Sequence, residues 1–328
     1  MLLQVLFAPR NSRRSEKNEP RSRGSIAIIT ALAFLPMSLI LAVVVDSGRS
    51  WVVRERLQNG VEASAVSVAQ TWMVTGTSCE SSALQIASAD GAAPSNLVCT
   101  TTGTNRGGVV SVSADENVKP IFSNLLGRDL VRISTTTKVR IGIASRAGNL
   151  RPIALCADNS NLQDWIRSGM KPDVTVRVPF LSPSTLCGGD VSGNWTVLDF
   201  NGGSSSNNET QDWISKGYDQ LVTVGDVLYG SPGVPATSLK FNVIVGQVIT
   251  FPIFSTPISQ GSNAKYTIVG FARAKIVSAQ LSGPQDSRGM TMQFLQGALS
   301  GSIGGNTSAD FGLTAWSVCS YESTGDCS

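Results

Sequence analysis

The feature that most constrains this chain is one uninterrupted apolar segment near its N-terminus. Residues 25–45 contain no charged side chain. At about 1.5 Å per residue, a helix of this length spans about 31 Å, which matches the hydrocarbon core of a bilayer. No other segment of the sequence combines this length with so continuous an apolar character. The segment therefore predicts a transmembrane helix that ties the rest of the chain to a membrane.

Basic residues are concentrated ahead of this segment. Residues 1–23 have a net charge of +4. Arg49, Arg54 and Arg56 follow the segment, but more basic residues precede it. The positive-inside rule then places the N-terminus in the cytoplasm and the bulk of the chain on the other side. We interpret residues 1–23 as a solvated cytoplasmic tail that sets topology, and expect no nucleic-acid binding.

A cleaved secretory signal is the main alternative for the apolar segment. The apolar region of a signal peptide has roughly 7–15 residues and ends at a small-x-small cleavage site. This segment is longer and ends in Val43, Val44, Val45 and Asp46, and the small-x-small match at residues 63–65 lies far beyond it. These features favour a retained anchor.

The sequence contains no histidine. This excludes a Ser-His-Asp triad, a Cys-His nucleophile pair and a histidine-ligated zinc site. We also find no paired carboxylates, phosphate-binding loop or dinucleotide-binding motif in a suitable context. We therefore predict that the chain is not an enzyme and has no catalytic residue, cofactor or metal.

Six cysteines all follow the apolar segment: Cys79, Cys99, Cys156, Cys187, Cys319 and Cys327. An even count in an oxidising compartment predicts disulfides. Fifteen pairings are compatible with six cysteines, and pairing between sequence neighbours is the simplest. Unpaired buried thiols are the alternative interpretation.

Apolar residues continue beyond the membrane segment at intervals of three and four. They are Val52, Val53, Leu57, Val61, Ala65, Val68, Ala69 and Trp72. This spacing predicts an amphipathic helix up to Met73, with one face against a partner. In one interpretation the face packs on the chain's own globular domain. In the other it also packs against helices of a filament or membrane complex.

The rest of the chain predicts mostly strands. The clearest signal is the period-two alternation over 131–143. Further expected strands are 109–113, 174–178, 195–200, 221–224, 239–251 and 266–277. We expect a loop over 75–108 and a short helix over 120–127. Residues 161–169 and 210–217 are related to each other, because both contain Gln-Asp-Trp-Ile and end in Gly. Each predicts a short helix that ends at its glycine.

The N-terminal block resembles a known family. A basic stretch and an apolar helix end in Val45, Asp46, Gly48 and Arg49, and a second helical motif follows. That motif consists of Arg54, Leu57, Gln58, Asn59, Glu62, Ala63 and Ala65. Over residues 21–73 this pattern resembles the TadG-like (TadE/G-like) proteins of Flp pilus assembly. The stretch from Val109 to Leu155, with Val118, Pro120 and Phe122, is also similar to this family.

The resemblance implies a non-catalytic, single-pass component of a bacterial Tad/Flp (tight-adherence) system in the inner membrane, pilin-like or assembly-associated. It implies contacts with lipid and, through the helix after the span, with other Tad/Flp proteins. The motif and helix-packing candidates are Asp46, Gly48, Arg49, Leu57, Gln58, Asn59 and Ala65. Ile29 stands where processed prepilins have Glu, so we expect no prepilin-type cleavage. A membrane-anchored binding module or adhesin, independent of a pilus, is the alternative function.

Together these observations predict an α+β protein. A long membrane-spanning and amphipathic helix precedes a strand-rich, disulfide-braced extracytoplasmic head. We divide the chain into a tail over 1–23, the helix over 24–73, a first α+β region over 74–155 and a strand-rich region over 156–328.

Overall fold

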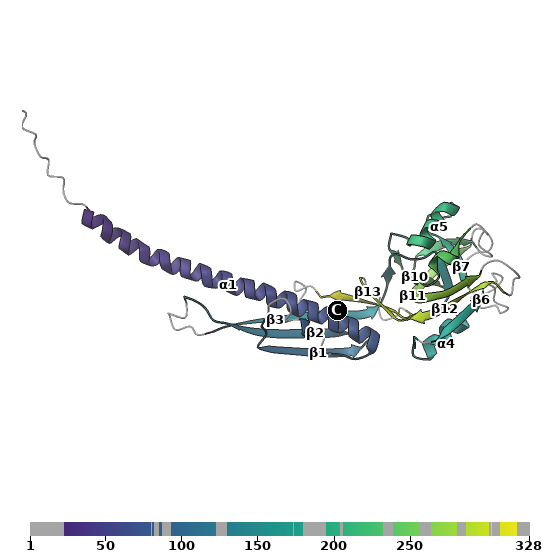
Figure 1. Ribbon diagram of the computed structural model, residues 1–328, viewed down its shortest axis with the longest axis horizontal. Helices are drawn as coiled ribbons and strands as arrows, with labels where there is room; N and C mark the ends of the chain where they lie inside the picture. Colours follow the sequence, from purple (N-terminus) through teal and green to yellow (C-terminus); the bar gives the residue numbers. More distant parts are fainter. Residues whose placement is uncertain are drawn as a thin grey trace, which may run out of the picture. The chain divides into compact units, whose positions relative to one another are not determined.

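The computed structural model is drawn in Figure 1, and its residues divide into two compact units. One comprises residues 1–51 and 119–131, and the other comprises 52–118 and 132–328. The structure describes residues 23–79, 81, 85–86, 93–122, 130–172, 174–179, 195–203, 206–231, 239–255, 264–280, 287–301, 303 and 309–319. The predicted four-part division of the chain stays a prediction.

Helix α1 (Arg23–Thr75) is continuous over 53 residues. Its N-terminal part exposes an apolar surface, with Ile28, Leu32, Phe34, Met37 and Val44 each at least 60% exposed. Within the described residues, α1 is the one helix long and apolar enough to cross a membrane. Exposed side chains of this kind are costly in water and are favourable in lipid, so the composition of this stretch suits a bilayer.

The second unit contains a five-stranded sheet beside the C-terminal part of α1 (Figure 1). Its strand order is β1-β2-β3-β14-β13. The strands are β1 (Asn96–Thr104), β2 (Gly107–Val118), β3 (Val131–Ile143), β14 (Leu313–Val318) and β13 (Gly297–Ser300). β1 and β2 form an antiparallel hairpin, β14 is antiparallel to β3, and β13 is parallel to β14. Segments far apart in sequence therefore complete one sheet.

The second unit also contains a seven-stranded sheet, in the order β10-β5-β7-β9-β11-β12-β6. These strands are β10 (Val248–Phe254), β5 (Ile153–Cys156), β7 (Trp195–Asp199), β9 (Val227–Ser231), β11 (Lys265–Gln280), β12 (Gly289–Leu295) and β6 (Thr175–Pro179). β10 also pairs with β11, so five strands close into a ring. A small sheet pairs β4 (Arg146–Ala147) with β8 (Val222–Thr223).

Two clusters of buried side chains stabilise this part of the unit. One contains Trp165, Phe251 and Phe294, with the Trp165 and Phe294 rings 5.3 Å apart. The other contains Phe254 and Tyr266, whose rings meet edge to face at 4.8 Å. Aromatic pairs in these geometries add to the free energy gained from burial.

The α+β class is confirmed, and most of the predicted strands are present. β3 begins and ends at the predicted residues, and β2, β6, β7, β8 and β11 overlap their predicted ranges. Two predictions were wrong. The supposed loop over 75–108 contains β1, and residues 241–244 form the 3-10 helix η2 (Phe241–Ile244), so β10 begins only at Val248.

The helix predicted over 120–127 falls largely outside the described residues. The described residues at its start, Ile121 and Phe122, form a bend.

The two related sequences form helices, α4 (Ser160–Arg167) and α5 (Asn207–Lys216). Ser206 and Glu209 form a capping box at the start of α5, and Gly217 with φ 93° ends it. The shared Trp-Ile pair packs differently in the two. Trp165 is buried in α4, whereas Ile214 is the buried member in α5.

One disulfide joins Cys79 to Cys99, which agrees with pairing between sequence neighbours. It ties the residues just after α1 to strand β1. Cys156 and Cys319 are also disulfide-bonded. Cys187 and Cys327 lie outside the described residues, so the predicted pairs 156–187 and 319–327 stay predictions.

Candidate functional site

The C-terminal part of α1 turns its apolar face toward the five-stranded sheet. We call this face the buried stripe: Leu57, Val61, Ala65, Val68, Ala69, Trp72 and Met73, each 7% exposed or less. The spacing of three and four residues places all seven side chains on one side of the helix. The predicted amphipathic face therefore packs within the chain.

Close approach at the end of the stripe depends on a glycine in β2. A Cβ atom added to Gly108 would lie 2.9 Å from Cη2 of Trp72 and 2.4 Å from the carbonyl oxygen of Thr102. Any larger residue at 108 would push the indole ring and the β1–β2 hairpin apart. Small side chains on the helix, such as Ala65 and Ala69, also allow close packing.

A polar groove lies between α1 and the sheet. We call it the helix–sheet groove, and its volume is about 430 Å³. It is lined by Arg54, Gln58 and Glu62 of α1, by Ser134, Thr135, Thr136 and Thr137 of β3, and by Val318 and Cys319. The three helix residues are four positions apart, so they project from one face.

The helix–sheet groove offers many hydrogen-bonding groups and one charge of each sign. Arg54 supplies donors only, Glu62 supplies acceptors, and Gln58 and the hydroxyls supply both. Arg54, Gln58 and Glu62 are all exposed. This mixture of groups suits a polar segment of another polypeptide, whose backbone also presents both donors and acceptors.

Asp46 connects two distant parts of the first unit. It is only 8% exposed, although it is charged. Its Oδ1 accepts a hydrogen bond from the Ile121 N–H at 2.8 Å, and its Oδ2 accepts one from the Phe122 N–H at 3.1 Å. Bonds from N–H donors to a carboxylate are stronger than neutral ones, and they offset the cost of burying the charge. We call this arrangement the Asp46 clamp.

The other predicted site residues are distributed around α1. Leu57 and Ala65 belong to the buried stripe, and Gln58 lines the helix–sheet groove. Arg49 and Asn59 are exposed. Gly48 is exposed too, and a Cβ atom added to it would meet nothing within 4 Å. The structure brings these residues onto one helix without gathering them into a single site.

Sequence reasoning missed several residues that complete these features. Arg54 and Glu62 appeared only as motif positions, although their four-residue spacing from Gln58 was a usable signal. Phe122 was noted only as part of the family resemblance and Ile121 was not noted, because their contacts with Asp46 span 75 and 76 residues of sequence.

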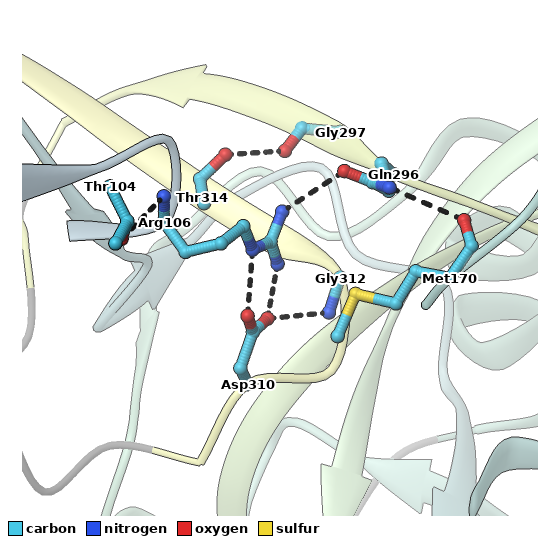
Figure 2. A network of polar contacts seen from close by, with 8 residues as sticks. All are labelled: Thr104, Arg106, Met170, Gln296, Gly297, Asp310, Gly312 and Thr314. Carbon is cyan, nitrogen blue, oxygen red and sulfur yellow. Dashed lines mark hydrogen bonds and ion pairs between the residues drawn. The ribbon is translucent and has the colours of Figure 1, made fainter. Parts of the chain in front are cut away.

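A second polar network joins the β1–β2 turn to the segment before β14 (Figure 2). The Arg106 guanidinium donates to both carboxylate oxygens of Asp310, with Nε 2.7 Å from Oδ2. Arg106 Nη1 also donates to Gln296 at 3.4 Å, and the Gly312 N–H donates to Asp310 at 2.9 Å. These groups satisfy one another, which indicates a structural link rather than a reactive site. Among the residues that the structure describes, no three Cys, Asp or Glu side chains are placed to hold a metal ion.

Residues 24–71 match the Tad family, described as "Putative Flp pilus-assembly TadE/G-like". The match confirms the resemblance predicted from the motif residues of this segment. The matched segment lies within α1, and it covers both the membrane-compatible stretch and most of the buried stripe. No curated protein and no solved structure matches the chain.

Proposed function

We propose that this chain is a non-catalytic, single-pass component of a bacterial Flp/Tad pilus-assembly system. The observation behind this proposal is the position of the family match, because residues 24–71 coincide with one continuous helix. The helix changes from an exposed apolar surface to a face buried on the chain's own sheet. The N-terminal part of such a helix anchors the chain in a membrane, and its C-terminal part packs against the chain's own folded head.

The orientation follows from charge. The net +4 of residues 1–23 favours a cytoplasmic N-terminus in the inner membrane. The head is then extracytoplasmic, where the Cys79–Cys99 disulfide persists.

We assign partner binding to the exposed face of α1 after the span. The buried stripe is occupied by the chain's own sheet, so another Tad/Flp protein would meet the exposed residues that flank the stripe. There the helix–sheet groove presents Arg54, Gln58 and Glu62 with a row of hydroxyls from β3. A polar segment of an assembly protein fits this lining, and the head would act as a pilin-like or assembly-associated subunit.

A pull-down of the anchored chain from native membranes tests this function. The expected result is co-purification of other pilus-assembly proteins, and their loss in the variant Gln58→Arg, which fills the groove with a long cation. Gln70→Arg is the matched control, because Gln70 is an exposed glutamine of the same helix outside the groove. Equal recovery of partners with both variants would contradict the role of the groove. Recovery of no pilus-assembly protein with the unmodified chain would favour the independent adhesin.

A further inference from the structure

We propose that the bend at Ile121 and Phe122 is a second membrane contact, which lies in the lipid interface beside the emerging helix. The proposal rests on the anchoring role of α1 given above. It concerns only the first unit, in which α1 up to Trp51 and residues 119–131 belong together.

The depth of the bend follows from the Asp46 clamp. Asp46 is the first residue after the apolar segment 25–45, whose length matches the hydrocarbon core. Its carboxylate must then lie at the boundary between acyl chains and headgroups. The hydrogen bonds of 2.8 and 3.1 Å hold the backbone of Ile121 and Phe122 at that same level.

The side chains at the bend suit this position. Ile121 is 51% exposed and Phe122 is 41% exposed, although both are apolar. Leu130, at the other described end of the connection, is 61% exposed. Lys119 is exposed next to them and can reach lipid phosphates, as basic residues at a membrane surface do. Trp51, 65% exposed and about 9 Å along the helix from Val45, is a typical interfacial anchor.

Lipid is the occupant that the observations favour, because the apolar surface is continuous with one that lipid must cover. None of the most apolar stretch in the N-terminal part of α1 is buried. The Asp46 clamp attaches the bend directly to the end of this surface. A protein partner would instead have to fit between the bend and the bilayer. The backbone N–H donors bind both carboxylate oxygens of Asp46, and these bonds offset the energetic cost of a charge at this depth.

Depth-dependent fluorescence quenching tests the proposal. Single cysteines are placed at Ile121 or Phe122 in the full chain, labelled with an environment-sensitive dye and reconstituted in vesicles of phosphatidylethanolamine and phosphatidylglycerol. The unmodified chain is the labelling blank. The expected result is a blue-shifted emission, quenched more by spin-labelled lipids with the label near the headgroup than by lipids labelled at the acyl-chain end.

Two further label positions separate the possible outcomes. Leu221→Cys is the matched control, because Leu221 is an exposed apolar residue of the second unit, and it should show less quenching. Met37→Cys reports the span and should be quenched most by labels deep in the acyl chains. Quenching at 37 without quenching at 121 and 122 would overturn the second contact and leave the anchor intact. No quenching at 37 would contradict the anchor itself.

The variant Asp46→Ala, made with the label at 121, tests the role of the clamp. We expect weaker quenching at 121 and unchanged quenching at 37, because the backbone of the bend loses its acceptor. Unchanged quenching at 121 would show that Asp46 does not hold the bend at the interface. A blue-shifted emission at 121 that no lipid quencher reduces would show that protein covers the bend, and would overturn the proposal.

Discussion

At the scale of single residues, a motif position has gained a physical role. Asp46 belongs to the Val-Asp-x-Gly-Arg pattern, and its carboxylate satisfies two backbone N–H groups of the bend at Ile121 and Phe122. This role requires two acceptor oxygens on a short side chain, and the Asp46 carboxylate provides both. From the sequence, Asp46 could be recognised only as the residue that ends the apolar segment. Its hydrogen bonds could not be predicted, because the N–H donors come from a distant part of the chain.

Asp46→Ala should accelerate hydrogen exchange at the amides of Ile121 and Phe122. A hydrogen bond to a charged group is worth about 1.5–3 kcal/mol, so local opening should become at least about tenfold easier. Exchange measured by mass spectrometry or NMR in detergent checks this. Asp219→Ala is the matched control, since Asp219 is an exposed aspartate of the other unit. Unchanged exchange at both amides would contradict the clamp.

A second residue-scale prediction concerns acid stability. A side-chain hydrogen bond from Arg132, aided by one from Ser134, lowers the pKa of Asp115 from its ordinary value of 3.8. Because the folded pKa is the lower one, this carboxylate stabilises the fold above pH 3.8. The contribution is lost as the pH falls from there through the folded pKa.

Asp115→Asn should therefore flatten the acid limb of the stability curve. Denaturant unfolding at a series of pH values measures it, and Arg132→Gln should have the same effect by removing the main cause of the shift. Asp219→Asn serves as the control for loss of an exposed charge. An acid limb as steep in Asp115→Asn as in the unmodified chain would contradict the assignment.

At the scale of elements, α1 combines two environments in one helix. Its N-terminal part exposes apolar side chains, whereas its C-terminal part buries a stripe that contains Leu57, Val61 and Ala65. Both could be predicted, because apolar length and three-to-four spacing are local signals. The element that covers the stripe could not be predicted, because packing against a sheet and packing against a partner helix require the same three-to-four spacing of apolar residues.

Leu57→Ala should destabilise the second unit of the full chain by about 2–5 kcal/mol, because removing most of a fully buried side chain leaves a cavity. Gln58→Ala, one residue along but on the exposed groove, should change the free energy of unfolding by less than about 0.5 kcal/mol. Urea unfolding of the full chain in detergent compares them. Equal, small effects would mean that the stripe is not packed in the free chain.

The strands differ in how visible they are in the sequence. β3 alternates over its whole length, and its ends could be predicted from that alternation. β1 could not be predicted, because its last six residues, Cys-Thr-Thr-Thr-Gly-Thr, are polar on both faces and the strand pairs only with β2 at the edge of the sheet. Apolar residues at 241–244 match a strand in composition, but that segment forms η2.

At the scale of the whole second unit, one ion pair joins residues 204 positions apart. Arg106 is in the turn after β1, and Asp310 precedes β14, so their contact ties the first hairpin to the last described strand. Both side chains are less than a quarter exposed. Such a closure cannot be recognised from a single sequence, because neither residue belongs to a local pattern.

A double-mutant cycle with Arg106→Ala and Asp310→Ala should give a coupling free energy of about 0.5–3 kcal/mol. Chemical denaturation of the four proteins measures it. Arg132 and Asp310 do not contact each other in the described structure, so the same cycle with Arg132→Ala and Asp310→Ala is the control and should be additive. Additivity in the first cycle would contradict the link.

At the scale of the whole chain, we propose that the helix over residues 24–71 remains part of the mature protein and holds it in a membrane. The most direct measurement is the intact mass of the protein recovered from native membranes after an alkaline wash. The expected result is that the washed membranes retain a chain that still contains residues 24–71. A chain that lacks the apolar segment 25–45 and is released by the wash would contradict it.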